Sequence, residues 1–161
     1  MKYFAYGSNL TLKQMKDRCP GARKIGIGRL YGYEICFPRK SSSREGKGVA
    51  SIYEKGGRFV EGVLFKLTSS DWNRLDKYED VPNSYIRKSV TISMDDGTEI
   101  PAETYSAVPM KGAPFKPSTK YLNLIISGAE ENGLSRDYIN KLCELGKIRK
   151  KLMRVKSSRM K

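Results

Sequence analysis

The sequence contains no histidine among its 161 residues, and this absence excludes more chemistry than any other feature of the composition. Without imidazole there is no Ser-His-Asp or Cys-His catalytic arrangement, no His-ligated zinc and no histidine proton shuttle. The three cysteines, Cys19, Cys36 and Cys143, are odd in number and far apart, which predicts neither a disulfide framework nor a Cys-x-x-Cys metal site. Proton transfer would have to use carboxylates, lysines, tyrosines or thiols, and we expect no metal and no cofactor.

Long apolar runs are also missing. No stretch approaches the roughly 18 residues that a membrane span needs, and Met1–Tyr6 leads into a strand-like pattern instead of a signal peptide. The cysteine usage fits a reducing compartment, so we expect a cytoplasmic protein with no membrane partner. The length predicts one domain, residues 1–146, followed by a basic tail, residues 147–161.

The net charge of +14 is concentrated in that tail. Residues 147–161 include eight Lys or Arg and no acid, which leaves +6 on the other 146 residues, from 23 basic and 17 acidic side chains. A solvated chain end is the simpler interpretation, and contact with nucleic acid or anionic lipid is the alternative. The tail has no aromatic residue for base stacking, so we do not expect a nucleic-acid partner.

Hydrophobic periodicity and turn signals predict several short strands joined by hairpins, with helices between them. Strands are expected at residues 2–6, 25–30, 33–37, 49–53, 59–67, 85–94 and 99–108. Helices are expected at residues 11–18, 69–79, 118–132 and 135–145, the first opened by a capping box of Thr11 and Gln14. Residues 40–47, rich in Ser, Gly and Arg, are expected to form a mobile loop. This order favours an α+β fold with a mostly antiparallel, strongly curved sheet.

The segment Tyr6-Gly7-Ser8-Asn9-Leu10 is the first candidate site. A strand ends there and a helix begins two or three residues later. Backbone N–H groups at such a junction attract carboxylates or oxyanions, and Ser8 and Asn9 add side-chain donors. An ordinary strand-to-helix turn has the same composition, so spacing alone leaves both interpretations open.

Glu79 is the second candidate. Trp72, Leu75 and Glu79 share one face of the predicted helix at i, i+3 and i+7 spacing, so Glu79 lies at the edge of an apolar stripe. Partial desolvation there would raise the pKa of its carboxyl toward the range useful for acid and base catalysis. The alternative is a helix-end residue that turns outward. Asp76 lies off the stripe, and we expect it to face solvent.

Several motifs resemble the γ-glutamylcyclotransferase family, in the same order along the chain. Tyr3-Phe-Ala-Tyr-Gly-Ser-Asn-Leu10 is similar to its N-terminal signature, and Leu75-Asp-Lys-Tyr-Glu79, with Tyr85 six residues on, is similar to the segment that carries its catalytic glutamate. Further matches are Gly48-Val-Ala-Ser-Ile52, Glu61-Gly62-Val63, Glu103-Thr-Tyr105 and the stretch from Pro117-Ser118 through Tyr121 to Gly128-Ala129. The resemblance covers about Met1 to Leu145.

The resemblance implies a small β-barrel with flanking helices and an enzyme that releases 5-oxoproline from a γ-glutamyl amide by intramolecular cyclisation. It implies that Glu79 is the catalytic acid/base. The substrate loop would consist of Tyr3, Phe4, Ala5, Tyr6, Gly7 and Ser8, with Asn9 supporting it and Tyr105 and Tyr121 lining the pocket. Taken alone, these tyrosines predict only core packing. The family usually has glycine after the catalytic glutamate, where this chain has Asp80.

The expected partner is a small-molecule γ-glutamyl substrate that supplies its own amine as the nucleophile, which suits a chain without histidine. One alternative is a cyclotransferase that removes the γ-glutamyl group from an amine or a biosynthetic intermediate. Another is a catalytically silent binding module with a basic tail. The identity of the leaving amine and the formation of a homodimer stay open.

Overall fold

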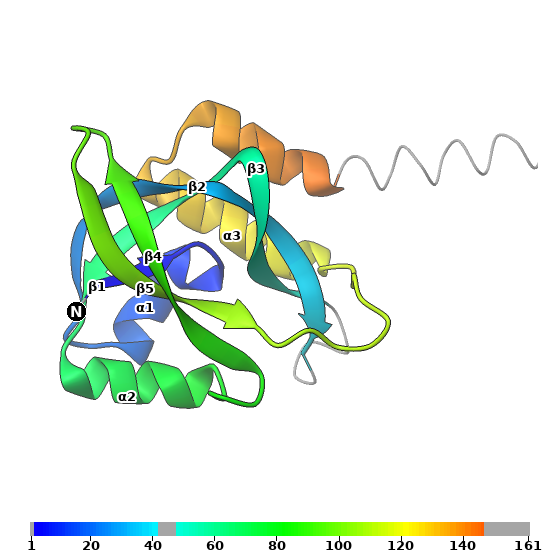
Figure 1. Ribbon diagram of the computed structural model, residues 1–161, viewed down its shortest axis with the longest axis horizontal. Helices are drawn as coiled ribbons and strands as arrows, with labels where there is room; N and C mark the ends of the chain where they lie inside the picture. The colour runs from blue at the N-terminus through cyan, green and yellow to red at the C-terminus, as the bar shows by residue number, and fades with distance from the viewer. Residues whose placement is uncertain (1, 42–47, 147–161) are drawn as a thin grey trace, which may run out of the picture.

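The computed structural model describes residues 2–41 and 48–146, which form a β-barrel with helices packed around it (Figure 1). The strands are β1 (Lys2–Ala5), β2 (Arg23–Lys40), β3 (Gly48–Lys66), β4 (Tyr85–Met94) and β5 (Glu99–Ala107). The helical elements are the 3-10 turn η1 (Ser8–Leu10) and the α-helices α1 (Leu12–Arg18), α2 (Ser69–Tyr78) and α3 (Thr119–Asn132). Residues 136–146 are helical as well.

The barrel closes in the strand order β1-β3-β2-β4-β5. All neighbouring strands are antiparallel except β1 and β5, which pair in parallel at Tyr3 and Glu103. This confirms the α+β fold with a mostly antiparallel, curved barrel. The short β1 lies between β3 and β5. It ends at Ala5, and the turn at residues 6–9 follows directly at this end of the barrel.

The strands expected at residues 25–30, 33–37, 49–53 and 59–67 suggest two hairpins formed by sequence neighbours, and this pairing is wrong. The chain forms one long pair of strands, β2 and β3, in which Tyr31 pairs with Phe59 and Tyr33 with Glu54. Gly32 therefore lies opposite residues 55–58 as an irregularity within the ladder. Gly32 and Gly57 have φ of +81° and +80°, so the glycines that indicated turns are used to bend a continuous pair of strands.

Local sequence signals set the ends of α2 and α3 as predicted. Thr68 and Asp71 form a reciprocal capping box at the start of α2. Ser118 accepts a hydrogen bond from the Tyr121 N–H at the start of α3, and Gly133 ends that helix at φ +77°. The capping box predicted at Thr11 is absent, because the Thr11 hydroxyl donates to the Ser8 carbonyl instead.

Two glycines allow the elements around η1 to approach closely. A Cβ on Gly128 of α3 would lie 2.6 Å from the Cβ of Leu10, and one on Gly62 of β3 would lie 2.7 Å from the ring of Phe4. Leu10 and Phe4 are fully buried. The close approach of α3 to η1 and of β3 to β1 therefore holds the turn at residues 6–9 from both sides.

A buried carboxylate joins the helix at residues 136–146 to the barrel. Glu61 of β3 is 1% exposed, and its two oxygens accept hydrogen bonds from the Ser135 N–H (2.8 Å) and hydroxyl (2.6 Å). The Arg29 guanidinium on β2 lies 3.1 Å away and balances the charge. The glutamate of the Glu61-Gly62-Val63 motif is thus a structural anchor for this helix.

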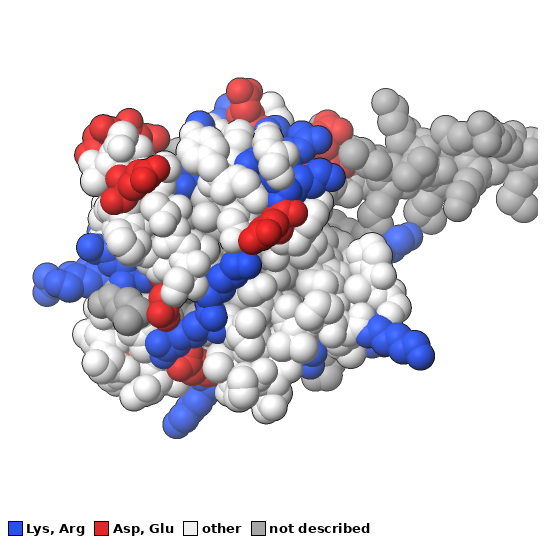
Figure 2. All heavy atoms as spheres, viewed as in Figure 1, with Lys and Arg blue, Asp and Glu red and all other residues white. Residues whose placement is uncertain are grey.

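The charged surface of the domain is mixed. Figure 2 shows Lys and Arg side chains scattered among Asp and Glu on the viewed face, with no single basic patch. None of the described helices is both long and apolar enough to cross a membrane. The expectations for a mobile loop at residues 40–47 and for a basic tail at residues 147–161 concern segments of which residues 42–47 and 147–161 lie outside the described ranges.

Candidate active site

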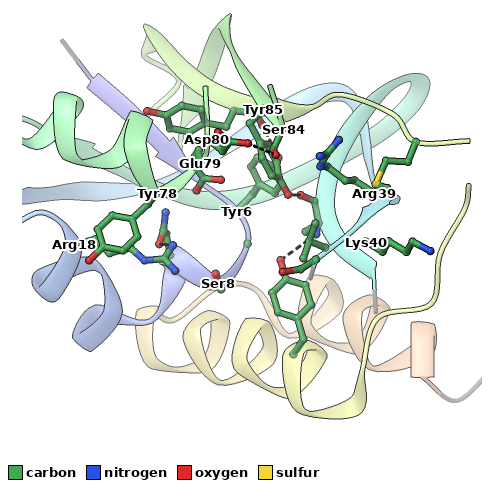
Figure 3. A pocket seen from close by; sticks show the side chains of 18 of the residues that line it. Tyr6, Ser8, Arg18, Arg39, Lys40, Tyr78, Glu79, Asp80, Ser84 and Tyr85 are labelled. Atoms are coloured by element: carbon green, nitrogen blue, oxygen red, sulfur yellow. Dashed lines mark hydrogen bonds between the residues drawn. The ribbon is translucent and has the colours of Figure 1, made fainter. Parts of the chain in front are cut away.

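A cleft of about 630 Å³ opens at the end of the barrel where β1 leads into η1 (Figure 3). Most of the predicted site residues line this cleft, although they lie far apart in the sequence. These are Tyr3, Tyr6, Gly7, Ser8, Asn9, Glu79, Tyr105 and Tyr121. The cleft thus brings together the two segments that the sequence marks as candidate sites.

The floor of the cleft near β1 is the turn at residues 6–9. The Leu10 N–H donates to the Gly7 carbonyl and the Thr11 N–H donates to the Ser8 carbonyl, which closes the 3-10 turn. The first N–H groups of such a turn lie outside its own hydrogen-bond pattern. Gly7 has φ −107° and ψ −138°, and its Cα faces the Tyr121 hydroxyl and Ala50 so closely that a Cβ there would contact both.

Side chains of α1 hold this turn in place. The Asn9 amide nitrogen donates to the Tyr3 hydroxyl (2.9 Å), while its oxygen accepts from both Gln14 Nε2 and Arg18 Nη1 (2.9 Å each). Gln14 Nε2 also donates to the Ser8 hydroxyl oxygen (2.8 Å). Gln14 and Arg18 are four residues apart and share one face of α1. That face therefore clamps both polar side chains of the turn.

Glu79 is the C-cap of α2, and its N–H donates to the Leu75 carbonyl. Trp72 and Leu75 are buried as the predicted stripe requires, and Glu79 is half-buried and lines the cleft. Burial raises the pKa of the Tyr3 hydroxyl far above its usual value, and the negative charge of Glu79 raises it further. Tyr3 of β1 and Glu79 thus line the same cleft.

The prediction that Asp76 faces solvent is wrong, because its carboxylate contacts β4 and β5. Its Oδ1 accepts hydrogen bonds from the Tyr105 hydroxyl (2.6 Å) and Arg87 Nε (2.9 Å), and its Oδ2 accepts from Arg87 Nη2 (2.6 Å). Arg87 also lies 4.4 Å above the Trp72 ring. Burial raises the pKa of Asp76, but the bonds from Arg87 and Tyr105 outweigh it and hold the pKa below its usual value. The helix that leads to Glu79 is therefore fixed to β4 by an ion pair and to β5 by the Tyr105 hydrogen bond.

Asp80 has a left-handed backbone conformation with φ +50°. Glycine adopts this conformation without steric cost, and aspartate is one of the few other residues that tolerate it. Hydrogen bonds from the Ser84 hydroxyl (2.7 Å) and the Asn83 amide lower the pKa of the Asp80 carboxyl. The side chain is exposed, so Asp80 faces the solvent at the rim of the cleft.

Tyrosine hydroxyls bond to the backbone around the cleft. The Tyr6 hydroxyl donates to the Tyr105 carbonyl (2.6 Å), and the Tyr85 hydroxyl donates to the Ala50 carbonyl (2.9 Å). The Tyr121 hydroxyl accepts from the Ala50 N–H (3.0 Å). Burial raises the pKa of Tyr6 and of Tyr105, so both stay protonated at neutral pH. These rings form a rigid wall with fixed hydroxyl orientations.

Phe4 and Ala5 do not line the cleft. Neither side chain has exposed surface. Consecutive side chains of a strand point to opposite faces, so the burial of both shows that β1 is covered on its two faces. The structure adds cleft residues that the sequence reasoning missed, namely Arg18, Arg39, Lys40 and Tyr78. An arginine in the last turn of a helix gives no local signal of a site. Within residues 2–41 and 48–146, no three Cys, Asp or Glu side chains converge on a position suited to a metal ion.

Known proteins resemble this chain in both sequence and fold. The AIG2-like family profile matches residues 59–142. The γ-glutamylcyclotransferase of Bos taurus is 37% identical over 144 residues, covering 87% of this chain and 76% of that protein, and the Homo sapiens protein of the same name is 35% identical with the same coverage. A solved γ-glutamyl cyclotransferase superposes with a TM-score of 0.81 at 32% identity, covering 93% of this chain and 98% of its own.

Proposed function

This chain belongs to the γ-glutamylcyclotransferase family, and from that membership we propose that it cleaves a γ-glutamyl amide into 5-oxoproline and a free amine or amino acid, with Glu79 as the proton carrier. The observation that carries the proposal is the meeting of Glu79 with the turn at residues 6–9 in one cleft of about 630 Å³. A γ-glutamyl dipeptide is small enough for such a volume.

The reaction needs a folded substrate more than it needs a protein nucleophile. The substrate's α-amine attacks its own γ-carbonyl, a new C–N bond closes the five-membered ring, and the bond to the leaving nitrogen breaks. Correct orientation in such intramolecular reactions is equivalent to effective concentrations of about 10⁵ M or more. The rigid tyrosine wall and the clamped turn are suited to hold the substrate in the attacking conformation.

Glu79 accounts for the proton transfers. A substrate α-ammonium has a pKa near 8 and carries three protons, of which the lactam nitrogen keeps one. The other two pass to the leaving nitrogen, which departs as an ammonium. A half-buried carboxylate at the edge of the cleft can accept a proton from the attacking amine and return it to the leaving amine. The backbone amides of Gly7–Asn9 are the proposed donors to the oxyanion that forms between these steps.

The decisive experiment replaces the carboxyl without changing its shape. We expect Glu79→Gln to lower 5-oxoproline formation from γ-glutamyl-alanine by about 10²–10⁴-fold, the usual contribution of a general acid/base. Chromatography measures the product, and thermal unfolding checks that the variant folds. The matched control is Glu99→Gln, which neutralises an exposed carboxyl at the start of β5. A Glu79→Gln protein with turnover near that of the control would contradict the proposed role.

A further inference from the structure

Arg18 is held rigidly inside the cleft although the proposed proton transfers do not use it. Its guanidinium lies 4.9 Å from the centre of the Tyr78 ring, and its Nη1 donates to Asn9 Oδ1 at 2.9 Å. The backbone carbonyl of Arg18 accepts a hydrogen bond from Arg74 of α2 (2.9 Å), which fixes the end of α1. Side chain and backbone are thus both positioned before any ligand arrives, which lowers the entropy lost on binding.

The surroundings of Arg18 supply a second donor and an opposite charge. The Ser8 hydroxyl accepts from Gln14, which also bonds to Asn9 beside Arg18, and a hydroxyl that accepts keeps its own proton to donate. Glu79 and Arg18 both act on the Tyr3 hydroxyl, Glu79 raising its pKa and Arg18 lowering it. Figure 3 shows Arg18, Ser8 and Glu79 toward one end of the cleft. Both residues line the cleft, so this end presents a cation and an anion to a ligand.

We propose that Arg18, assisted by the Ser8 hydroxyl, binds the α-carboxylate of the substrate's γ-glutamyl group. The α-carbon of that group carries a carboxylate and an amine on the same atom, which is the charge pattern that neighbouring Arg18 and Glu79 complement. A guanidinium has five N–H donors and binds a carboxylate with two parallel hydrogen bonds, and the bond to Asn9 uses one donor of Arg18. This inference rests on the proposed function, because it assumes that Glu79 receives the amine.

The other cations of the cleft are placed for a different part of the substrate. Arg39 and Lys40 lie toward the opposite end in Figure 3. Arg39 donates to the Val108 carbonyl (3.3 Å), which ties its guanidinium to the segment after β5. The Lys40 ammonium lies 5.5 Å from the centre of the Phe115 ring. Arg18 is thus the cation on the Glu79 side of the cleft.

The test compares two substrates that differ only in the α-carboxylate. γ-Glutamyl-alanine has it, whereas 4-aminobutyryl-alanine lacks it but keeps the amine and the amide, and cyclises to 2-pyrrolidinone. We expect Arg18→Gln to lower kcat/KM for γ-glutamyl-alanine by roughly ten- to a hundredfold, the value of one charge-assisted carboxylate contact, mainly through KM. For 4-aminobutyryl-alanine the same change should be under about threefold. Arg18→Lys, which keeps the charge, should recover part of the preference. The control is Arg136→Gln, an exposed cation on the helix at residues 136–146 outside the cleft, which should leave the preference unchanged.

Each outcome decides between the roles open to Arg18. An equal loss on both substrates would mean that Arg18 acts through Glu79 or through the turn, and would overturn the inference, as would an unchanged preference. If 4-aminobutyryl-alanine is not turned over, its inhibition constant against γ-glutamyl-alanine replaces kcat/KM, and Arg18→Gln should leave that constant unchanged within about threefold. Failure of the wild-type chain to form 5-oxoproline would contradict the proposed function itself, so the two failures are distinguishable.

Discussion

The two sides of the cleft are supported by different kinds of interaction. The turn at residues 6–9 is held by the side chains of Ser8 and Asn9. Their partners Tyr3, Gln14 and Arg18 are close to them in sequence. The end of α2 is held by Asp76, whose partners Arg87 and Tyr105 lie 11 and 29 residues away on β4 and β5. One support is local and mainly neutral, and the other is long-range and ionic.

The stability of the turn and the stability of the α2 support can therefore be measured separately by their pH dependence. The turn keeps its contacts across a wide pH range, because amides and hydroxyls do not titrate there. The α2 support depends on an ionised carboxylate with a lowered pKa, so acid removes it. Substitutions on each side should therefore differ in size and in pH dependence.

The largest effect is expected from Asp76→Ala. It leaves the Arg87 guanidinium and the Tyr105 hydroxyl without their shared acceptor, and we expect a loss of about 2–3 kcal/mol in the free energy of unfolding. Displacement of Glu79 by about 1 Å would also cost on the order of 10²-fold in kcat. Urea unfolding and 5-oxoproline assays at neutral pH measure the two effects.

The same variant tests whether the support is ionic. A carboxyl with a lowered folded-state pKa stabilises the protein above its unfolded pKa of about 3.9, and this stability is lost as pH falls through the folded value. The difference in unfolding free energy between wild type and Asp76→Ala should therefore shrink as the pH falls below about 4. A difference that stays constant from neutral pH to pH 3 would contradict an ionic support.

A smaller effect is expected from Asn9→Ala on the other side. Asn9 is buried, and its loss leaves the Tyr3 hydroxyl, Gln14 and Arg18 without a common partner. We expect a loss of about 1–2 kcal/mol that does not change between pH 4 and pH 8. Urea unfolding across that range measures it, with Lys13→Ala, an exposed residue of α1, as the control. A pH-dependent loss would mean that the turn is also held by a titrating group.

The smallest effect is expected at the rim, where Asp80 occupies a left-handed conformation. Asp80→Gly relieves the steric cost but removes the bonds to Ser84 and Asn83, so its melting temperature should stay close to that of wild type. Asp80→Ala keeps the strained φ and also loses both bonds, so it should melt lower than Asp80→Gly. Because the Asp80 carboxyl is exposed, neither variant should move the acid limb of the pH–rate profile. A clear shift of that limb in Asp80→Gly would show that Asp80 tunes Glu79.

Elements with both ends marked in the sequence were predictable. The capping box at Thr68, the cap at Ser118, the glycine at 133 and the turn at 95–98 each act within a few residues, so α2, α3 and the β4–β5 hairpin follow from local chemistry. The β2–β3 pair was not predictable in this way. A glycine with positive φ ends a strand or bends one, depending on which strand lies opposite.

In the candidate site, too, local spacing was predictable and contacts between distant segments were not. The helical spacing of Trp72, Leu75 and Glu79 predicts which face of α2 is buried, and the structure has that face. The environment of Asp76 depends on Arg87 and Tyr105, which reach it only when the barrel closes, so its helical angle alone gave the wrong surroundings. Arg18 was missed for a similar reason, because Tyr78 of α2 forms the other side of its binding position.

The parallel pairing of Tyr3 in β1 with Glu103 in β5 means that β1 cannot complete its pairing until β5 has been synthesised. The ribosome makes the turn at residues 6–9 long before it makes β5, at a rate of about 5–20 residues per second. Until Glu103 has left the exit tunnel, β1 has one of its two neighbours missing and the tyrosine wall is incomplete. Tyr121 of the same cleft follows Glu103 in the sequence, so the nascent chain carries its glycine-serine segment without a complete cleft for several seconds.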